Sequence, residues 1–225
     1  MENYETVKKD FNEISDIAEP RWNHNNCYFG SLMKHVSEDC ELILEIGCGK
    51  GELSNLLSKR SEHVIGVDLA DRMIEKAISR YGYKNIDFIC KNILDMSFGE
   101  NSFDVIITTA TAHHLPYEWL LLFAKRHLRP GGKLIILDLY KSKTLSDMFF
   151  NIFAVVPNIF MNLVHNHSIQ KDDEHSRDVW RRHGEHDTYM TLNEIRDLAE
   201  EHLPGFKMKR KLFWRYLLVW GKPKE

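Results

Sequence analysis

The chain has 225 residues, of which 43% are hydrophobic and 28% charged, as in one ordinary globular domain with a sizeable buried core. Its formal net charge of -3 excludes a chain-wide attraction for polyanions, so charge gives no argument for a nucleic-acid partner. The start, Met1 to Glu5, lacks the basic and apolar regions of a secretory signal, and the four cysteines include no CxxC pair. We therefore expect a reducing, cytoplasmic location.

The first 40 residues predict a helical N-terminal cap. Apolar residues recur at helical spacing from Val7 to Ile17, and Pro20 ends that pattern. A second helix is expected from Asn26 to Val36. The pattern then changes, because Leu42–Ile46 is a short apolar run followed by a glycine cluster, which is typical of a buried strand.

From residue 41 to residue 140, apolar runs of strand length alternate with segments of helical period. The expected strands are Leu42–Ile46, His63–Val67, Ile86–Cys90, Phe103–Thr109 and Lys133–Leu139, and the expected helices are Leu53–Leu57, Asp71–Arg80 and Tyr117–His127. Strands that alternate with helices imply parallel pairing and right-handed crossovers. This region therefore predicts the core of a three-layer, Rossmann-like α/β fold with helices on both faces of the sheet.

The alternation breaks after Leu139, and residues 141–190 are rich in aromatic residues and histidines. Met148 to Val164 carries no charge but is shorter than the ~20 residues of a membrane span and contains Pro157, so we expect a buried or cleft-facing helical pair instead. Phe149 and Phe153 either line an apolar cleft there or form the core of the insert.

Residues 191–225 predict one last helix and a hairpin. Thr191 and Glu194 have the spacing of a capping box, and the helix that they open ends near Leu203. Two apolar runs, Phe206–Leu212 and Trp214–Trp220, follow as a hairpin that completes the sheet. The whole chain is thus expected to form a single domain.

A glycine-rich turn follows the first predicted strand. Gly47, Gly49 and Gly51 permit positive φ and a close approach of the backbone to a ligand at the carboxyl end of the sheet. Asp68 ends the next strand, where a carboxylate accepts hydrogen bonds from both ribose hydroxyls of a nucleoside. The series of strand, turn, helix, strand and acid therefore predicts an adenosine site, against the alternative of a tight turn with a surface aspartate.

The spacing of the glycines also bears on which ligand is bound. They follow GxGxG, whereas dinucleotide sites use GxGxxG. Glu52 stands where the third glycine of a dinucleotide site would be, and its negative charge would repel a pyrophosphate. Glu45 adds a second negative charge near the site. Two carboxylates favour a ligand that carries a sulfonium and an ammonium over NAD or FAD.

Residues 42–139 resemble the class I S-adenosylmethionine-dependent methyltransferases of the ubiquinone-biosynthesis-like type. Besides the glycine turn and Asp68, the resemblance includes Asn101 to Ile107, Ala112 to Leu115 and the Pro-Gly-Gly turn of Leu128 to Leu134. It implies a sheet of seven strands, mostly parallel with the last antiparallel, N-terminal lid helices, and a helical substrate cover inserted after the fifth strand.

The resemblance also implies residues for each part of the site. Asn92 departs from the aspartate that the family more often has there, and Trp22, His24, Tyr28 and Tyr140 are candidates for the lid or the substrate side. A helix packed on the flank of the sheet is the alternative for this cap. The residues that the resemblance places around S-adenosylmethionine are Glu45, Gly47, Cys48, Gly49, Asp68, Leu69, Met73, Asn92, Ile93, Thr109 and His114.

Methyl transfer from a sulfonium is an in-line displacement, so positioning the acceptor and excluding water carry most of the catalysis. A base is required only if the acceptor starts as a hydroxyl or a protonated amine. His114 is the first candidate and His24 the second, with a structural hydrogen bond as the alternative for His114; His113, Asp138 and Tyr140 are weaker candidates. Histidines 165, 167, 183 and 186 lack a CxxC partner and the displacement needs no Lewis acid, so no metal is expected.

The sequence therefore predicts a methyltransferase that acts on an oxygen or nitrogen atom of a small, apolar or aromatic acceptor and gives S-adenosyl-L-homocysteine as product. We expect a monomer or homodimer. A peptide or nucleic-acid methyltransferase is an alternative, although Thr108 to Thr111 stands where a nucleic-acid enzyme would have an Asn/Asp-Pro-Pro-aromatic motif. The other alternative is a non-catalytic module that binds S-adenosylmethionine.

Overall fold

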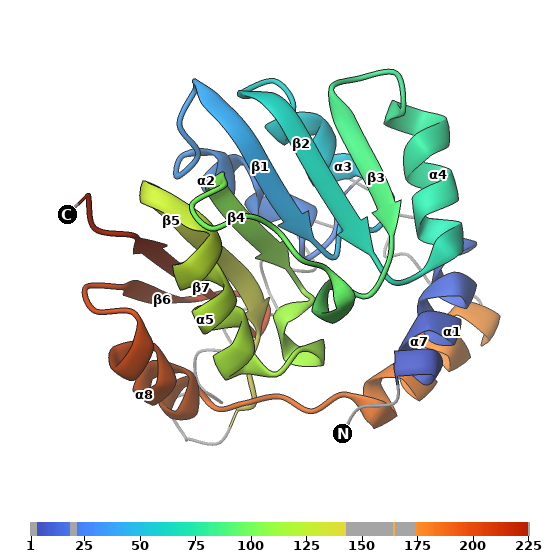
Figure 1. Cartoon of the computed structure of the whole chain (residues 1–225). Coiled ribbons are helices and arrows are strands. Elements are labelled where there is room, and N and C mark those ends of the chain that lie inside the picture. Colours follow the sequence, from blue (N-terminus) through green and yellow to red (C-terminus); the bar gives the residue numbers. More distant parts are fainter. Residues whose placement is uncertain (1–3, 19–21, 143–163, 165–173, 225) are drawn as a thin grey trace.

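The computed structural model describes residues 4–18, 22–142, 164 and 174–224. Within these residues, seven strands form one sheet in the order β3-β2-β1-β4-β5-β7-β6 (Figure 1). The strands are β1 (Cys40–Ile46), β2 (Ser61–Asp68), β3 (Ile86–Cys90), β4 (Phe103–Thr109), β5 (Leu128–Leu139), β6 (Lys207–Lys211) and β7 (Arg215–Gly221).

The pairing of the strands confirms the predicted topology. Strands β1 to β5 pair in parallel, whereas β7 runs antiparallel to both β5 and β6. The chain winds outward from β1 to β3 and then returns to β4 on the other side of β1. The direction of winding therefore reverses between β1 and β4, and in open α/β sheets ligands bind beyond the carboxyl ends of the strands at such a switch point.

Helices cover both faces of the sheet because successive strand residues point to opposite sides. Leu44 packs with α5 (Tyr117–His127) and α8 (Leu192–His202), whereas its neighbour Ile43 packs with α2 (Phe29–Met33) and α3 (Glu52–Leu57). Helix α4 (Asp71–Tyr81) follows β2 and lies beside β3 at the edge of the sheet (Figure 1). The three predicted layers are confirmed.

Several element boundaries differ by one to three residues from the sequence-based prediction, and two elements differ more. The second helix is divided into a short 3-10 helix, η1 (Asn26–Tyr28), and α2. Strand β5 begins at Leu128 rather than Lys133, because the Pro-Gly-Gly segment is a bulge within the strand: Phe103 pairs with Leu128, and Val105 pairs with Lys133. A glycine at positive φ, Gly131 at +83°, permits this irregularity.

Two helices from distant parts of the chain lie side by side beyond the carboxyl ends of the strands. They are α1 (Tyr4–Ser15) and α7 (Glu174–His186), drawn in blue and orange in Figure 1. Phe149, Phe153 and the charge-free run up to Leu163 lie outside the described residues. None of the described helices has the length and apolar composition that crossing a membrane requires.

Candidate functional site

A cavity of about 670 Å³ lies at the carboxyl ends of β1, β2 and β4, and α1 and α7 contribute to its walls. This volume suits a small-molecule ligand. Every residue that the resemblance places around the methyl donor lines it. These residues are Glu45, Gly47, Cys48, Gly49, Asp68, Leu69, Met73, Asn92, Ile93, Thr109 and His114.

The turn after β1 has a backbone that favours glycine. Gly47, Gly49 and Gly51 have φ values of +75°, +51° and +81°. A Cβ atom on Gly47 would lie 2.0 Å from Oγ1 of Thr111, which leaves no room for a side chain. The turn is tied to the end of β2, because the N–H groups of Gly47 and Cys48 both donate to the carbonyl of Val67.

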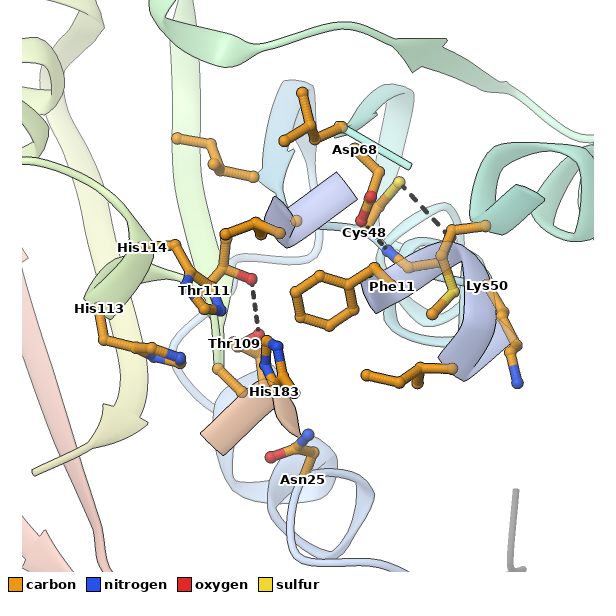
Figure 2. A pocket seen from close by; sticks show the side chains of 18 of the residues that line it. Phe11, Asn25, Cys48, Lys50, Asp68, Thr109, Thr111, His113, His114 and His183 are labelled. Carbon is orange, nitrogen blue, oxygen red and sulfur yellow. Dashed lines mark hydrogen bonds between the residues drawn. The ribbon is translucent and has the colours of Figure 1, made fainter. Parts of the chain in front are cut away.

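Asp68 links this turn to the start of α4. Its Oδ2 accepts a hydrogen bond from the N–H of Gly49 at 2.8 Å, and its Oδ1 accepts one from the N–H of Ala70 at 2.9 Å. Burial raises the pKa of Asp68, although these hydrogen bonds act in the opposite direction. Figure 2 shows the carboxylate on the wall of the cavity, where it can still accept a hydrogen bond from a ligand hydroxyl.

Glu45 places a second carboxyl group in the same cavity. It stands near the end of β1, is only 2% exposed and accepts a hydrogen bond from the hydroxyl of Ser54. Burial, together with the nearby charge of Asp68, raises the pKa of Glu45 to about 8. The carboxyl is therefore mostly protonated at pH 7, and a cationic ligand group beside it would favour its ionised form.

Further polar and apolar groups line the same cavity. Asn92 caps the short helix η2 (Ile93–Asp95), where its Oδ1 accepts from the N–H of Leu94. The buried Oγ1 of Thr109 has no hydrogen-bond partner among the described residues, so a ligand is a natural partner for it. Leu69, Met73 and Ile93 supply apolar surface.

Helix α1 forms a wall of the cavity through side chains that the sequence did not single out. The side chains of Val7, Phe11 and Ile14 line it. Charged contacts hold the helix in place: Asp16 pairs with Lys76 of α4 at 2.7 Å, and Glu13 pairs with Arg182 of α7 at 2.5 Å. Helical periodicity predicted the apolar face of α1, but its position over the cavity depends on these long-range contacts.

The cavity also contains three histidines. His113 and His114 lie on η3 (Ala112–His114), directly after β4, and His183 lies on α7. The ring of Phe11 stands edge-on to both His114 and His183, with centroids 5.6 Å and 4.7 Å apart. Asp187 follows α7 and lines the same cavity; no local motif singled it out.

Only one of the four residues predicted for the lid or the substrate side lines the cavity. His24 lines the cavity and stacks on Phe213 at a centroid distance of 4.6 Å. Trp22, Tyr28 and Tyr140 are not among the lining residues: Trp22 packs edge-on against Phe213, and the hydroxyl of Tyr28 donates to the carbonyl of Leu212 at 2.9 Å. Trp22 and Tyr28 thus fasten the N-terminal segment to the turn between β6 and β7.

Comparison with known families identifies the core of the chain. Residues 44–136 match the family described as the methyltransferase domain. This match includes the end of β1, the glycine turn, Asp68, η3 and β5 up to Ile136. Residues 44–136 of the chain thus match a methyltransferase domain. The predicted family and the predicted fold are both confirmed.

Similar proteins extend this likeness over nearly the whole chain. An uncharacterized methyltransferase of Mycobacterium tuberculosis is 26% identical over 204 residues, which cover 90% of this chain and 98% of that protein. N-methyltransferase NodS of Bradyrhizobium japonicum, solved with S-adenosyl-L-homocysteine, has a TM-score of 0.62 at 16% identity over 98% of both chains. The geranyl diphosphate C-methyltransferase of Streptomyces coelicolor has a TM-score of 0.65 at 11% identity over 97% of both chains. The two solved structures share the methyltransferase fold but act on different acceptor atoms.

Proposed function

We propose that the domain binds S-adenosylmethionine in this cavity and transfers its methyl group to an oxygen or nitrogen atom of a small acceptor. The observation that carries the proposal is the convergence of the GxGxG turn, Asp68 and Glu45 on one cavity at the switch point of the sheet. The two carboxyl groups in this cavity suit a donor with a sulfonium and an ammonium.

The pose of the donor follows from the positions of these groups. Asp68 accepts hydrogen bonds from the ribose hydroxyls, and Leu69, Met73 and Ile93 pack around the adenine. Glu45 and the glycine turn lie toward the methionine part, where the ammonium is closest to a carboxyl group. NodS, solved with S-adenosyl-L-homocysteine, has the same fold, which supports this choice of ligand.

The acceptor then occupies the part of the cavity lined by Phe11, His114 and His183. An apolar ring beside imidazole groups suits a small, apolar or aromatic molecule with one reactive polar atom. The chain contributes mainly by aligning that atom with the methyl carbon and the sulfur, and by excluding water. His24 and His114, the predicted proton acceptors, both line the cavity. The four cysteines are free thiols, which suits a cytoplasmic enzyme.

The experiment that tests this function uses S-adenosylmethionine with an isotope-labelled methyl group. Purified protein is incubated with panels of phenols, amines and peptides, and both label transfer and S-adenosyl-L-homocysteine are measured. We expect transfer to a phenol or amine, and its loss in Asp68→Asn but not in Asp87→Asn, an exposed aspartate of β3. Transfer to peptides alone would support the alternative acceptor class, and donor binding without any product would indicate a non-catalytic module.

A further inference from the structure

Four side chains from two distant parts of the chain meet inside the cavity. His113 and His114 come from η3, His183 from α7, and Asp187 from the segment after α7. One ligating atom each of His113, His114 and Asp187 lies within 4.8 Å of the others, and Nε2 of His183 lies 3.7 Å from Oδ1 of Asp187. In Figure 2 the three histidines lie on one side of the Phe11 ring, with Cys48 and Lys50 on the other. We call these four residues the His–Asp cluster.

The distances within the His–Asp cluster fit ligands around one ion. Nε2 of His113 lies 3.9 Å from Oδ2 of Asp187, and Nδ1 of His114 lies 3.8 Å from Oδ1. Both separations exceed the length of a hydrogen bond. A metal ion with bonds of about 2.1 Å holds neighbouring ligand atoms about 3.0 to 3.4 Å apart and opposite ones about 4.2 Å apart. The ligating atoms of His113, His114 and Asp187, which lie within 4.8 Å of one another, therefore need only a small contraction to coordinate a metal.

A second set of groups orients these side chains. Nδ1 of His113 lies 2.7 Å from Oδ1 of the buried Asp138, so its Nε2 faces Asp187. The hydroxyl of Tyr189 donates to Oδ2 of Asp187 at 2.5 Å. Nδ1 of His183 lies 3.6 Å from a carboxylate oxygen of Asp10. Metal-binding histidines commonly donate their other N–H to a carboxylate, as His113 does to Asp138.

Burial separates this arrangement from a chance group of surface residues. The side chains of His113, His114, His183 and Asp187 are between 4% and 7% exposed. Imidazole ligands with one carboxylate favour zinc, iron, cobalt or manganese over magnesium and calcium, which prefer oxygen alone. Because the cluster lines the cavity, the remaining coordination positions of such an ion face the place of the acceptor.

We propose that His113, His114 and Asp187, with His183 as a fourth ligand, bind one divalent first-row transition-metal ion that holds the methyl acceptor. The binding of the metal ion is argued from the cluster alone. That this ion holds the methyl acceptor rests on the proposed function. This proposed site replaces the expectation of no metal, which was based on the spacing of histidines along the chain. Asp187 and His113 are 74 positions apart, and only the folded chain brings them together.

A bound metal ion would activate a hydroxyl acceptor for methyl transfer. A hydroxyl that coordinates the ion becomes more acidic and loses its proton to water, leaving an alkoxide or phenolate on the ion. A lone pair of that oxygen forms the bond to the methyl carbon while the carbon–sulfur bond breaks, and its electrons remain on the sulfur of S-adenosyl-L-homocysteine. His114 then acts as a ligand rather than as a base.

Cobalt tests the site because Co²⁺ absorbs visible light when it is bound by nitrogen and oxygen ligands. Protein without an affinity tag is dialysed against a chelator and titrated with Co²⁺. We expect an absorption band that saturates at one equivalent per chain and disappears when Zn²⁺ is added. Absence of a saturable band, with Zn²⁺ also failing to bind in calorimetry, would overturn the proposal.

Variants locate the site. His113→Ala and Asp187→Asn should each weaken Co²⁺ binding at least tenfold, and Asp138→Asn, which removes an orienting group, should weaken it about 10- to 100-fold. The matched control is His63→Ala, because His63 and Asp87 form an exposed pair at 2.9 Å on β2 and β3. Unchanged binding in both ligand variants would contradict the assignment.

Two further measurements distinguish a loss of metal binding from a loss of the fold or of donor binding. Thermal melting and the calorimetric affinity for S-adenosylmethionine show whether each variant is folded, and His113→Gln replaces any variant that is not. Loss of Co²⁺ binding with intact donor binding supports the metal site. A wild-type protein that binds Co²⁺ in the cluster but not S-adenosylmethionine would refute the proposed function and leave the metal site standing.

Discussion

Glu45 is a buried carboxyl group whose ionisation is coupled to its surroundings. Its ordinary pKa is 4.5, and burial raises the pKa of Glu45 to about 8 in the folded protein without a donor. The group is therefore mostly protonated at pH 7. The ammonium of S-adenosylmethionine would lower this pKa again, because an opposite charge favours the carboxylate.

We expect donor binding at pH 7 to release most of a proton, and the affinity to rise between pH 6 and pH 8 as Glu45 ionises. Calorimetry in two buffers of different ionisation enthalpy measures this release. Glu45→Gln keeps an acceptor for Ser54 but should remove the release and flatten the pH dependence. Identical enthalpies for the wild-type protein in both buffers would contradict the coupling.

At the scale of residues, the donor side of the site could be predicted and the acceptor side could not. Glu45, the glycines and Asp68 lie at the ends of consecutive parallel strands, so a short stretch of sequence determines their meeting point. Phe11 and Asp187 reach the cavity only through the packing of α1 and α7. No local pattern encodes that packing, and Asp187 was therefore missed.

The glycine turn is the element on which donor binding depends. Gly47→Ala forces a side chain into a backbone at φ +75° and against Thr111, so we expect a loss of about 1 to 3 kcal/mol in stability and a weaker affinity for the donor. Gly30→Ala in α2 is the control, because a Cβ there meets nothing within 4 Å and alanine favours a helix. Denaturant unfolding and calorimetry measure both effects.

An equal loss of stability in the two glycine variants would show that the conformation of the turn is not what requires glycine at position 47.

The capping box predicted for α8 is confirmed, since the Thr191 side chain accepts from the N–H of Glu194 and the Glu194 side chain accepts from that of Thr191. Thr191→Ala should cost about 1 kcal/mol, or about 2 to 4 °C in Tm. Thr191→Ser should lose much less. Because α8 packs on the face of the sheet and not at the cavity, donor affinity should stay unchanged; a change in affinity would show that α8 influences the site.

Elements were predicted well where the local pattern was strong. Strand β4 and helix α5 have the predicted boundaries, whereas the start of β5 was missed because a bulge carries the strand through its Pro-Gly-Gly segment. Helix α2 was predicted too long. Its short apolar face does not reveal where the 3-10 turn η1 interrupts it.

At the scale of the whole molecule, the reversal of winding between β1 and β4 places the cavity, and α1 and α7 add two of its walls. The predicted cap of Trp22 and Tyr28 instead fastens the N-terminal segment to the turn between β6 and β7. The N-terminal region thus contributes to the cavity through α1 and through His24, which the sequence did predict.

The most direct test of the account is a calorimetric comparison of two ligands. The GxGxG turn, Glu45 and Asp68 predict that the protein binds S-adenosylmethionine at one site per chain and does not bind NAD. Asp68→Ala should weaken donor binding about 10- to 100-fold, because a charge-assisted hydrogen bond contributes about 1.5 to 3 kcal/mol. Binding of NAD, or no binding of S-adenosylmethionine by the folded protein, would contradict the account.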